Sequence, residues 1–150
     1  MKLNFNSGKM KLPPIEKIAE AYSAIADNRI SEENENTYIV TSSNKEKTYK
    51  VTINNNLYRS NDNATKFARY AGYPIIAVLM FKKLLPIPNQ YLQYFKDINW
   101  NEINKKYKRD YALALDHILA EKNIPDDIIL KIKESISECY DKFISLNIKI

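Results

Sequence analysis

Basic side chains gather in one segment of this chain of 150 residues. Residues 63–100 contain five basic groups but a single acidic one, Asp97, so the segment has a surplus of four positive charges within 38 residues. Such a local surplus is the pattern expected for a partner that carries phosphate groups. A solvated lysine face that serves solubility is the alternative, and the charge count alone supports either. The five basic residues are Lys66, Arg69, Lys82, Lys83 and Lys96.

Arginine and tyrosine side chains indicate how such a partner would be held. The planar guanidinium of Arg69, which follows the helix-capping cluster Asn61–Asn63, suits two parallel hydrogen bonds to a phosphate. Tyr107 and Tyr111 are four residues apart on one face of an expected helix, where their rings can stack on a base. Structural alternatives stay open: Arg69 as an ordinary exposed arginine, and at least one of the tyrosines as part of the core.

Groups for catalysis or metal binding are scarce. One histidine and one cysteine cannot form a Cys/His metal site, and two glycines cannot supply a P-loop or a dinucleotide fingerprint. Asp110 and Asp116 are six residues apart and do not share a helix face, so two-metal nucleotidyl transfer is not expected. We therefore expect no metal and no cofactor, and an autonomous hydrolase or transferase is the least favoured class of function.

The length fits one domain with a sizeable core, because 45% of the residues are hydrophobic. The single cysteine excludes a disulfide-stapled secreted scaffold and indicates a reducing cytosol. The longest apolar run, Pro74–Phe81, is far shorter than the ~20 residues of a membrane span, and Met1–Met10 lacks the apolar region of a secretory signal. We expect a cytoplasmic protein without a membrane partner, with residues 1–11 as a flexible arm and residues 12–150 as a single helical domain.

The spacing of hydrophobic residues predicts the helices and strands that would position these side chains. Apolar residues at helical spacing, with proline in several first turns, predict a chain that is largely helical. An acidic loop is expected at Ser31–Asn36, and a β-hairpin is expected at about residues 37–60 because the period changes to two there. The class predicted is mainly α with an inserted β-hairpin. The predicted helices are Leu12–Asn28, Ala64–Tyr70, Pro74–Leu85, Pro88–Phe95, Trp100–Lys122 and one that begins at Pro125.

The order of several short motifs resembles the C-terminal domain found in the large component of archaeal and eukaryotic DNA primase. Leu12–Ile18 resembles that family's F/L-P-P-C-x-K opening, and Leu79–Lys82 resembles its L-F-L-K helix. Gln90–Phe95 stands where the family has a helix ending in Leu-x-Phe-Trp. Tyr107–Ala112, followed by His117, resembles the F-D-K-x-Y-x-Y-x-x-x-H helix with its histidine in register. The resemblance covers Leu12–Glu121 and is interrupted by the hairpin.

The family's domain holds a [4Fe–4S] cluster on four cysteines, and this chain lacks those ligands. Ile15 stands in the first cysteine place, and Cys139 is the only thiol, so no cluster can form. The sequence is similar in length, composition and missing ligands to the PriX family, the small noncatalytic primase subunits of Sulfolobus-type archaea. The resemblance implies a helical domain like the C-terminal domain of the primase large subunit, with an inserted β-hairpin and no Fe–S cluster.

This resemblance also implies a function and partners. The chain would be a noncatalytic subunit of an archaeal DNA primase that works with the small catalytic subunit and the large subunit. It would bind a ribonucleoside triphosphate, or the 5′-triphosphate of an RNA/DNA primer end, over a single-stranded DNA template. Lys82 matches a lysine that faces the phosphates, Arg109 matches a basic residue, and His117 is either a ligand-facing or a core histidine. The nucleotide- and nucleic-acid-binding residues expected are Arg69, Lys82, Arg109, Tyr111, His117, Arg59, Lys66 and Tyr107.

A second resemblance covers residues 37–81 only. Tyr49–Val51 through Ile75–Leu79 is similar to the SWIM pattern, a hairpin followed by a helix, in which C-x-C and C-x-H bind zinc. Tyr58–Ser60 and Gly72–Pro74 stand where the zinc ligands belong, and none of these residues is a ligand type. This alternative implies a metal-free adaptor that binds DNA or protein partners.

Overall fold

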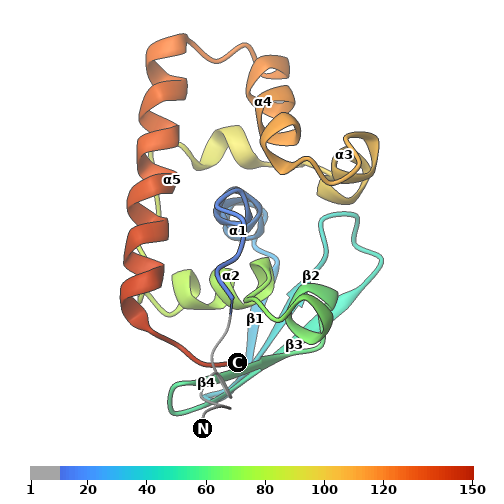
Figure 1. Ribbon diagram of the computed structural model, residues 1–150, viewed down its shortest axis with the longest axis vertical. Helices are drawn as coiled ribbons and strands as arrows, with labels where there is room; N and C mark the ends of the chain where they lie inside the picture. Colours follow the sequence, from blue (N-terminus) through green and yellow to red (C-terminus); the bar gives the residue numbers. More distant parts are fainter. Residues whose placement is uncertain (1–10) are drawn as a thin grey trace, which may run out of the picture.

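Helix α1 (Lys17–Ala26) runs through the centre of the described structure, a computed structural model that covers residues 11–150 (Figure 1). Four of its ten residues are alanines, and these small side chains let neighbouring elements approach the helix closely. Its largest side chain, Tyr22, packs edge-on against Phe95 with the ring centroids 5.3 Å apart. Figure 1 looks along α1 and shows that the remaining elements surround it, so the core forms around this helix.

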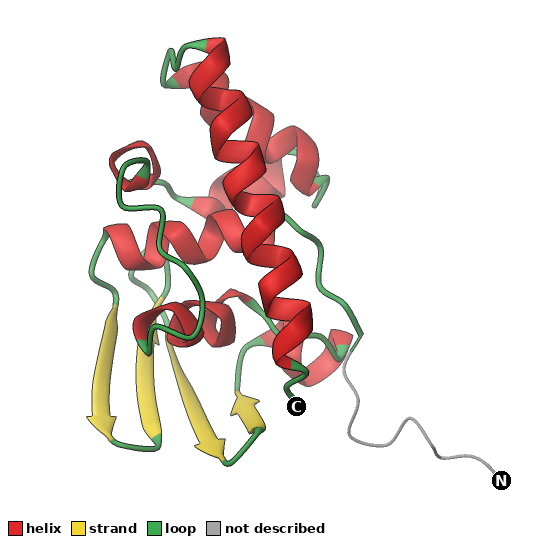
Figure 2. Ribbon diagram, turned by 90° about the vertical axis from the view of Figure 1, so that its left-hand side faces the viewer, coloured by secondary structure: helices red, strands yellow, loops and turns green. Residues whose placement is uncertain are grey.

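A four-stranded antiparallel sheet lies at one end of the described structure, below the helices in Figure 2, and its strands are in chain order. Alternate side chains of its strands are buried against the helices, among them Val40, Val51 and Tyr58. The opposite set faces solvent, as is common for an antiparallel sheet. The strands are β1 (Ile30–Asn34), β2 (Thr37–Thr41), β3 (Thr48–Asn54) and β4 (Leu57–Ser60).

The predicted fold class, mainly α with a β-hairpin at about residues 37–60, is wrong. Within residues 11–150 the chain combines helices with a full four-stranded sheet. Most of Ser31–Asn36, expected as an acidic loop, belongs to β1, which pairs with β2 through Ile30↔Val40 and Ser31↔Ile39. This edge strand buries only Ile30, so no apolar alternation in the sequence indicates a strand. Its exposed acidic side chains suit an edge strand because charge discourages pairing with another chain.

The single helix predicted over Trp100–Lys122 is also corrected, because it is two helices. Between them Lys108 and Arg109 have left-handed backbone conformations, with φ of 52° and 65°, and a helix cannot continue through these. Asp110 caps the second helix, since its carboxylate accepts a hydrogen bond from the Leu113 backbone N–H at 3.2 Å. The helical spacing of apolar residues continues across this break, so the sequence pattern does not reveal it. The two helices are α3 (Trp100–Lys106) and α4 (Tyr111–Glu121).

The helices predicted at Pro74 and after Pro125 are confirmed as α2 (Tyr73–Phe81) and α5 (Asp126–Leu146). Helix α2 is buried along most of its length, whereas α5 buries a single stripe. Burial raises the pKa of the Cys139 thiol in this stripe to about 12. The buried stripe of α5 consists of Ile132, Ile136, Cys139 and Phe143.

Two other segments predicted as helices are short turns. Residues 64–70 contain the π-helical turn η1 (Ala64–Ala68), and residues 88–95 contain the 3₁₀ turn η2 (Leu92–Phe95). The arm predicted for residues 1–11 lies outside the described residues except for Lys11, whose backbone N–H donates to the Arg69 carbonyl at 2.9 Å. None of the helices within residues 11–150 combines the length and apolar content that a membrane crossing requires.

Candidate functional site

The turn between β4 and α2 has an unusual backbone. It contains the π-helical turn η1, and such turns are rare and often occur at functional sites. The next residue, Arg69, has a φ of 66°, in the left-handed region that arginine seldom adopts. The short helix predicted over Ala64–Tyr70 is thus replaced by a turn that holds Arg69 in a fixed, exposed position.

A buried carboxylate holds this turn in place. Asp62 is only 5% exposed, and it accepts hydrogen bonds from the Thr65 backbone N–H at 3.1 Å and the Thr65 hydroxyl at 3.0 Å. The Ser60 hydroxyl also contacts the Asp62 carboxylate. The Thr65 hydroxyl in turn accepts from the Gly72 backbone N–H at 3.2 Å. These bonds connect the end of β4 to the start of α2 across the turn.

Gly72 is required by this arrangement. A Cβ at position 72 would collide with the Asp62 carboxylate and would lie 3.3 Å from the Ala64 Cβ. The absence of a side chain therefore allows the close approach of the two ends of the turn.

The outer surface of the turn presents basic and aromatic groups. Lys66, Phe67 and Arg69 are exposed, with Phe67 71% exposed. The Lys66 ammonium lies 5.2 Å from the centroid of the Phe67 ring. Among the ion pairs within residues 11–150, none involves Lys66 or Arg69. Their positive charges are thus available to a ligand.

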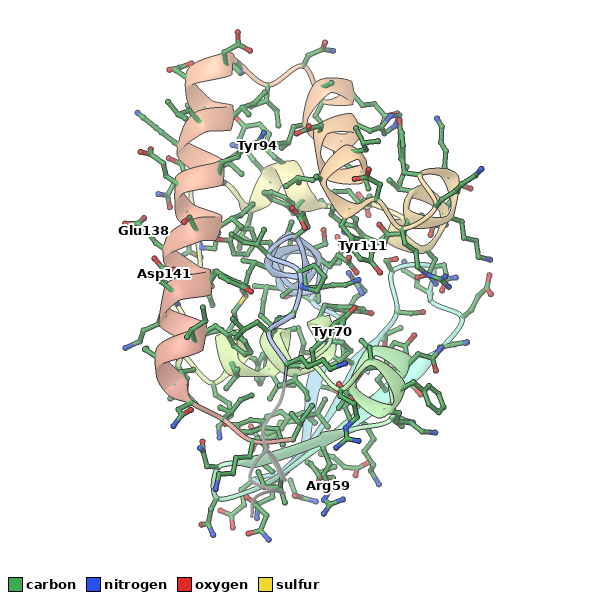
Figure 3. All side chains as sticks on the ribbon, in the orientation of Figure 1. Arg59, Tyr70, Tyr94, Tyr111, Glu138 and Asp141 are labelled. Atoms are coloured by element: carbon green, nitrogen blue, oxygen red, sulfur yellow. The ribbon has the colours of Figure 1, made fainter. Side chains whose placement is uncertain are left out.

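Next to the turn, two tyrosines meet over α1. The Lys17 ammonium lies 4.0 Å from the centroid of the Tyr111 ring at the start of α4. Burial raises the pKa of Tyr70, the nearby charge of Lys17 opposes this rise, and Tyr111 adds to it. Figure 3 shows Tyr70 and Tyr111 on the same flank of α1. We call Lys66, Arg69, Tyr70 and Tyr111 the turn face, and Phe67 is exposed next to it in the same turn.

Lys17 anchors this face rather than supplying free charge to it. Burial alone would lower the pKa of Lys17, but the Glu20 carboxylate, 3.0 Å away, together with Tyr111 and Tyr70, outweighs this effect and the pKa is raised. Glu20 also accepts a hydrogen bond from the Asn104 side chain of α3 at 3.4 Å. The lysine is charged at neutral pH, and the adjacent carboxylate neutralises it.

Two predicted residues, Tyr107 and His117, contact each other. The Tyr107 hydroxyl lies 2.9 Å from His117 Nδ1, and His117 Nε2 lies 3.5 Å from the Glu121 carboxylate. This pair joins the end of α3 to the middle of α4, a structural role for both side chains. Arg109 is exposed in the break between the helices, two residues before Tyr111.

Two other predicted residues lie away from the turn face. Lys82 is the C-cap of α2, so it lies about 15 Å along the helix from Gly72. Arg59 is exposed on β4 opposite Thr52, and Figure 3 shows it near the lower end of the molecule. The structure therefore does not bring Arg69 and Lys82 together as one phosphate site.

Sequence reasoning missed three residues at or beneath the turn face. The position of Lys17 beneath the face was not predicted, because a lysine is normally exposed and the burial of this one depends on its ion pair with Glu20, one helical turn away. Phe67 was hidden because an apolar residue in an expected helix is normally assigned to the core. The alternation of basic and aromatic residues in Lys66–Tyr70 is the signal that could have indicated Phe67 and Tyr70.

Two hollows of the described surface lie elsewhere. One, of about 320 Å³, lies between residues 86–91 and α5, and its lining includes Glu134 and Glu138. The other, of about 240 Å³, lies between the residues preceding α1 and helices α4 and α5, and its lining includes Ile15 and Ile136. Neither hollow is lined by a residue of the turn face.

Comparison with protein families gives one finding. The model of a family described as "Uncharacterised conserved protein UCP014422" matches residues 10–149, which include every helix and strand described above. No curated protein and no solved structure matches the chain.

Proposed function

We propose that this chain, which belongs to the family described as uncharacterised conserved protein UCP014422, is a noncatalytic subunit of an archaeal DNA primase. It binds the initiating nucleotide through the 5′-triphosphate and promotes the start of a primer. The observation that carries this proposal is the turn face. There the exposed Arg69, which forms no ion pair among the described residues, directly precedes Tyr70, and Tyr70 and Tyr111 lie on the same flank of α1 near Lys17.

The chemistry of the turn face suits a nucleoside triphosphate. Arg69 donates hydrogen bonds from its planar fork to the phosphate oxygens, and Lys66 adds a second positive charge. Tyr70 and Tyr111 supply aromatic surface for the base. The face is open rather than enclosed, so a template strand can reach a nucleotide that is bound there.

The resemblance to primase supports the same location for the nucleotide site. Two of the segments that resemble the primase domain are Leu12–Ile18 and Tyr107–Ala112, which are far apart in the sequence. They contribute Lys17 and Tyr111, whose ammonium and ring lie 4.0 Å apart. Two segments that resemble separate motifs of the primase domain thus lie together at the turn face.

A protein without catalytic groups can still promote initiation. A primase must hold two nucleotides on a template before any primer exists to position the first. A second binding site in the same complex raises the effective concentration of that first nucleotide and orients it, which lowers the entropic cost of the first bond. Extension of an existing primer has no such requirement.

The test uses the small and large primase subunits of the same organism, with and without this chain. We expect the wild-type chain to raise de novo initiation more than extension of a supplied primer. Arg69→Ala should raise the nucleotide concentration required for initiation by about 10-fold or more, the cost of losing hydrogen bonds to a charged group. Lys82→Ala is the matched control, because Lys82 is exposed at the far end of α2.

Two outcomes would contradict the proposal. Equal stimulation of initiation and extension would indicate a generic template-binding adaptor. Equal losses in Arg69→Ala and Lys82→Ala would indicate a diffuse basic surface without a nucleotide site.

A further inference from the structure

We propose that the exposed ring of Phe67 is a stacking platform for a base of single-stranded nucleic acid, the template that passes the turn face. This inference rests on the proposed function, because it assigns a second ligand to the same turn. It concerns a residue that the nucleotide site itself does not need.

The exposure of Phe67 is the first observation. At 71% it is the most exposed of the large apolar side chains within residues 11–150. The other exposed aromatic of this set, Phe81, packs edge-on against Tyr38 with ring centroids 6.0 Å apart. Phe67 has no aromatic partner among the described residues, and the Lys66 ammonium lies over its ring at 5.2 Å from the centroid. Most of the ring surface is nevertheless exposed and can contact a flat ligand.

The rigidity of the support is the second observation. Asp62, Thr65 and Gly72 are joined by hydrogen bonds that fix the turn from both ends. Because the backbone of the turn is already held by these bonds, it loses little conformational freedom when a base stacks on the ring of Phe67, which favours binding. The burial of Asp62 also removes the one acidic side chain of the turn from its surface.

The surroundings of the ring are the third observation, and they favour nucleic acid over an apolar protein surface. The exposed neighbours in the turn are amides and cations rather than further apolar residues. Lys11 is also exposed, and its backbone is bonded to the Arg69 carbonyl. Aromatic rings beside unpaired cations are typical of surfaces that stack bases and contact the phosphates between them. The exposed neighbours are Asn61, Asn63, Lys66 and Arg69.

The test measures the affinity of the full chain for a fluorescent oligothymidylate by anisotropy, and its affinity for ATP in parallel. Phe67→Ala should weaken oligothymidylate binding by about 5- to 100-fold, the range for one stacked base, and should leave ATP affinity within about two-fold. Phe67→Trp, which keeps an aromatic ring at this position, should bind oligothymidylate about as tightly as the wild type. Leu130→Ala is the matched control, because Leu130 is also exposed, at 62%, but lies on α5.

The salt dependence of binding distinguishes stacking on Phe67 from general electrostatic attraction. The loss caused by Phe67→Ala should persist at high ionic strength, whereas the loss caused by Lys66→Ala should fade. Unchanged oligothymidylate affinity in Phe67→Ala, or an equal loss in Leu130→Ala, would overturn the inference. A loss of affinity for the other primase subunits alone would also overturn it, because the ring would then be a protein contact. If no variant binds ATP but Phe67→Ala still loses oligothymidylate, the proposed nucleotide site fails and the stacking platform stands.

Discussion

Gly72 and Asp62 show how single residues determine the shape of the turn face. The carboxylate fills the space that a side chain at position 72 would need, and it binds the backbone and hydroxyl of Thr65 at the same time. Buried carboxylates of this kind stabilise a fold only when their oxygens are bonded. The position of Arg69 therefore depends on residues that do not contact a ligand.

Gly72→Ala should disrupt this arrangement. We expect a loss of about 1–3 kcal/mol in the free energy of unfolding, because the added methyl collides with the carboxylate. Urea unfolding followed by circular dichroism measures this loss. In an Asp62→Ala background the same methyl should cost less, since the carboxylate is gone and the two effects are not additive. Strictly additive losses would show that the collision is not the cause.

Individual residues also show how much of the candidate site can be predicted from a sequence. Arg69 and Tyr111 were predicted from residue type and spacing, and the structure places them at or beside the turn. Tyr107 was predicted in the same way and His117 from the resemblance to the primase helix motif, and the two side chains contact each other. Spacing along a helix gives the face on which a side chain lies, but it does not give the neighbour that faces it.

At the scale of elements, α5 is the clearest example of a pattern that determines a structure. Its buried stripe repeats at helical spacing from Ile132 to Phe143, and most residues on the other faces are polar. It also bonds to the segment before α1, through Tyr140 to the Pro13 carbonyl at 2.7 Å, and to the middle of α1, through Ser135 to the Tyr22 hydroxyl at 2.8 Å. This helix holds α1, and so the base of the turn face, in position.

Phe143→Ala tests the contribution of α5. Phe143 is fully buried, so we expect its truncation to lower the free energy of unfolding by about 3–5 kcal/mol. Ile144→Ala is the matched control, because Ile144 follows it on the same helix but is 40% exposed, and its loss should be much smaller. Chemical denaturation of both variants measures the difference. Comparable losses would mean that α5 is not held by this stripe.

Elements without such a pattern could not be predicted. Strand β1 buries one residue and carries acidic groups, so its identity depends on pairing with β2 rather than on its own sequence. The break between α3 and α4 depends on two left-handed residues, Lys108 and Arg109, which neither glycine nor proline marks. The π-helical turn likewise depends on the bonds of Asp62. Tertiary contacts determine these three features.

At the scale of the whole molecule, the turn face lies where distant parts of the chain meet. Helix α1, the turn after β4 and the start of α4 each contribute residues to it or support it, and Figure 1 shows α1 between the sheet and α4. The basic surplus lies in residues 63–100 of the sequence, but the structure divides it among the turn face, the far end of α2 and the end of η2, where Lys96 lies. Only the part beside the tyrosines is proposed to hold a nucleotide.

The most direct test of this account is to titrate ATP into the ¹⁵N-labelled full chain and follow every backbone amide by NMR. The account predicts that chemical-shift changes concentrate in residues 64–73 and 109–113 and that adenosine, which lacks phosphates, causes much weaker changes near Arg69. Changes centred on the hollow between residues 86–91 and α5, or no saturable changes at all, would contradict the proposed nucleotide site.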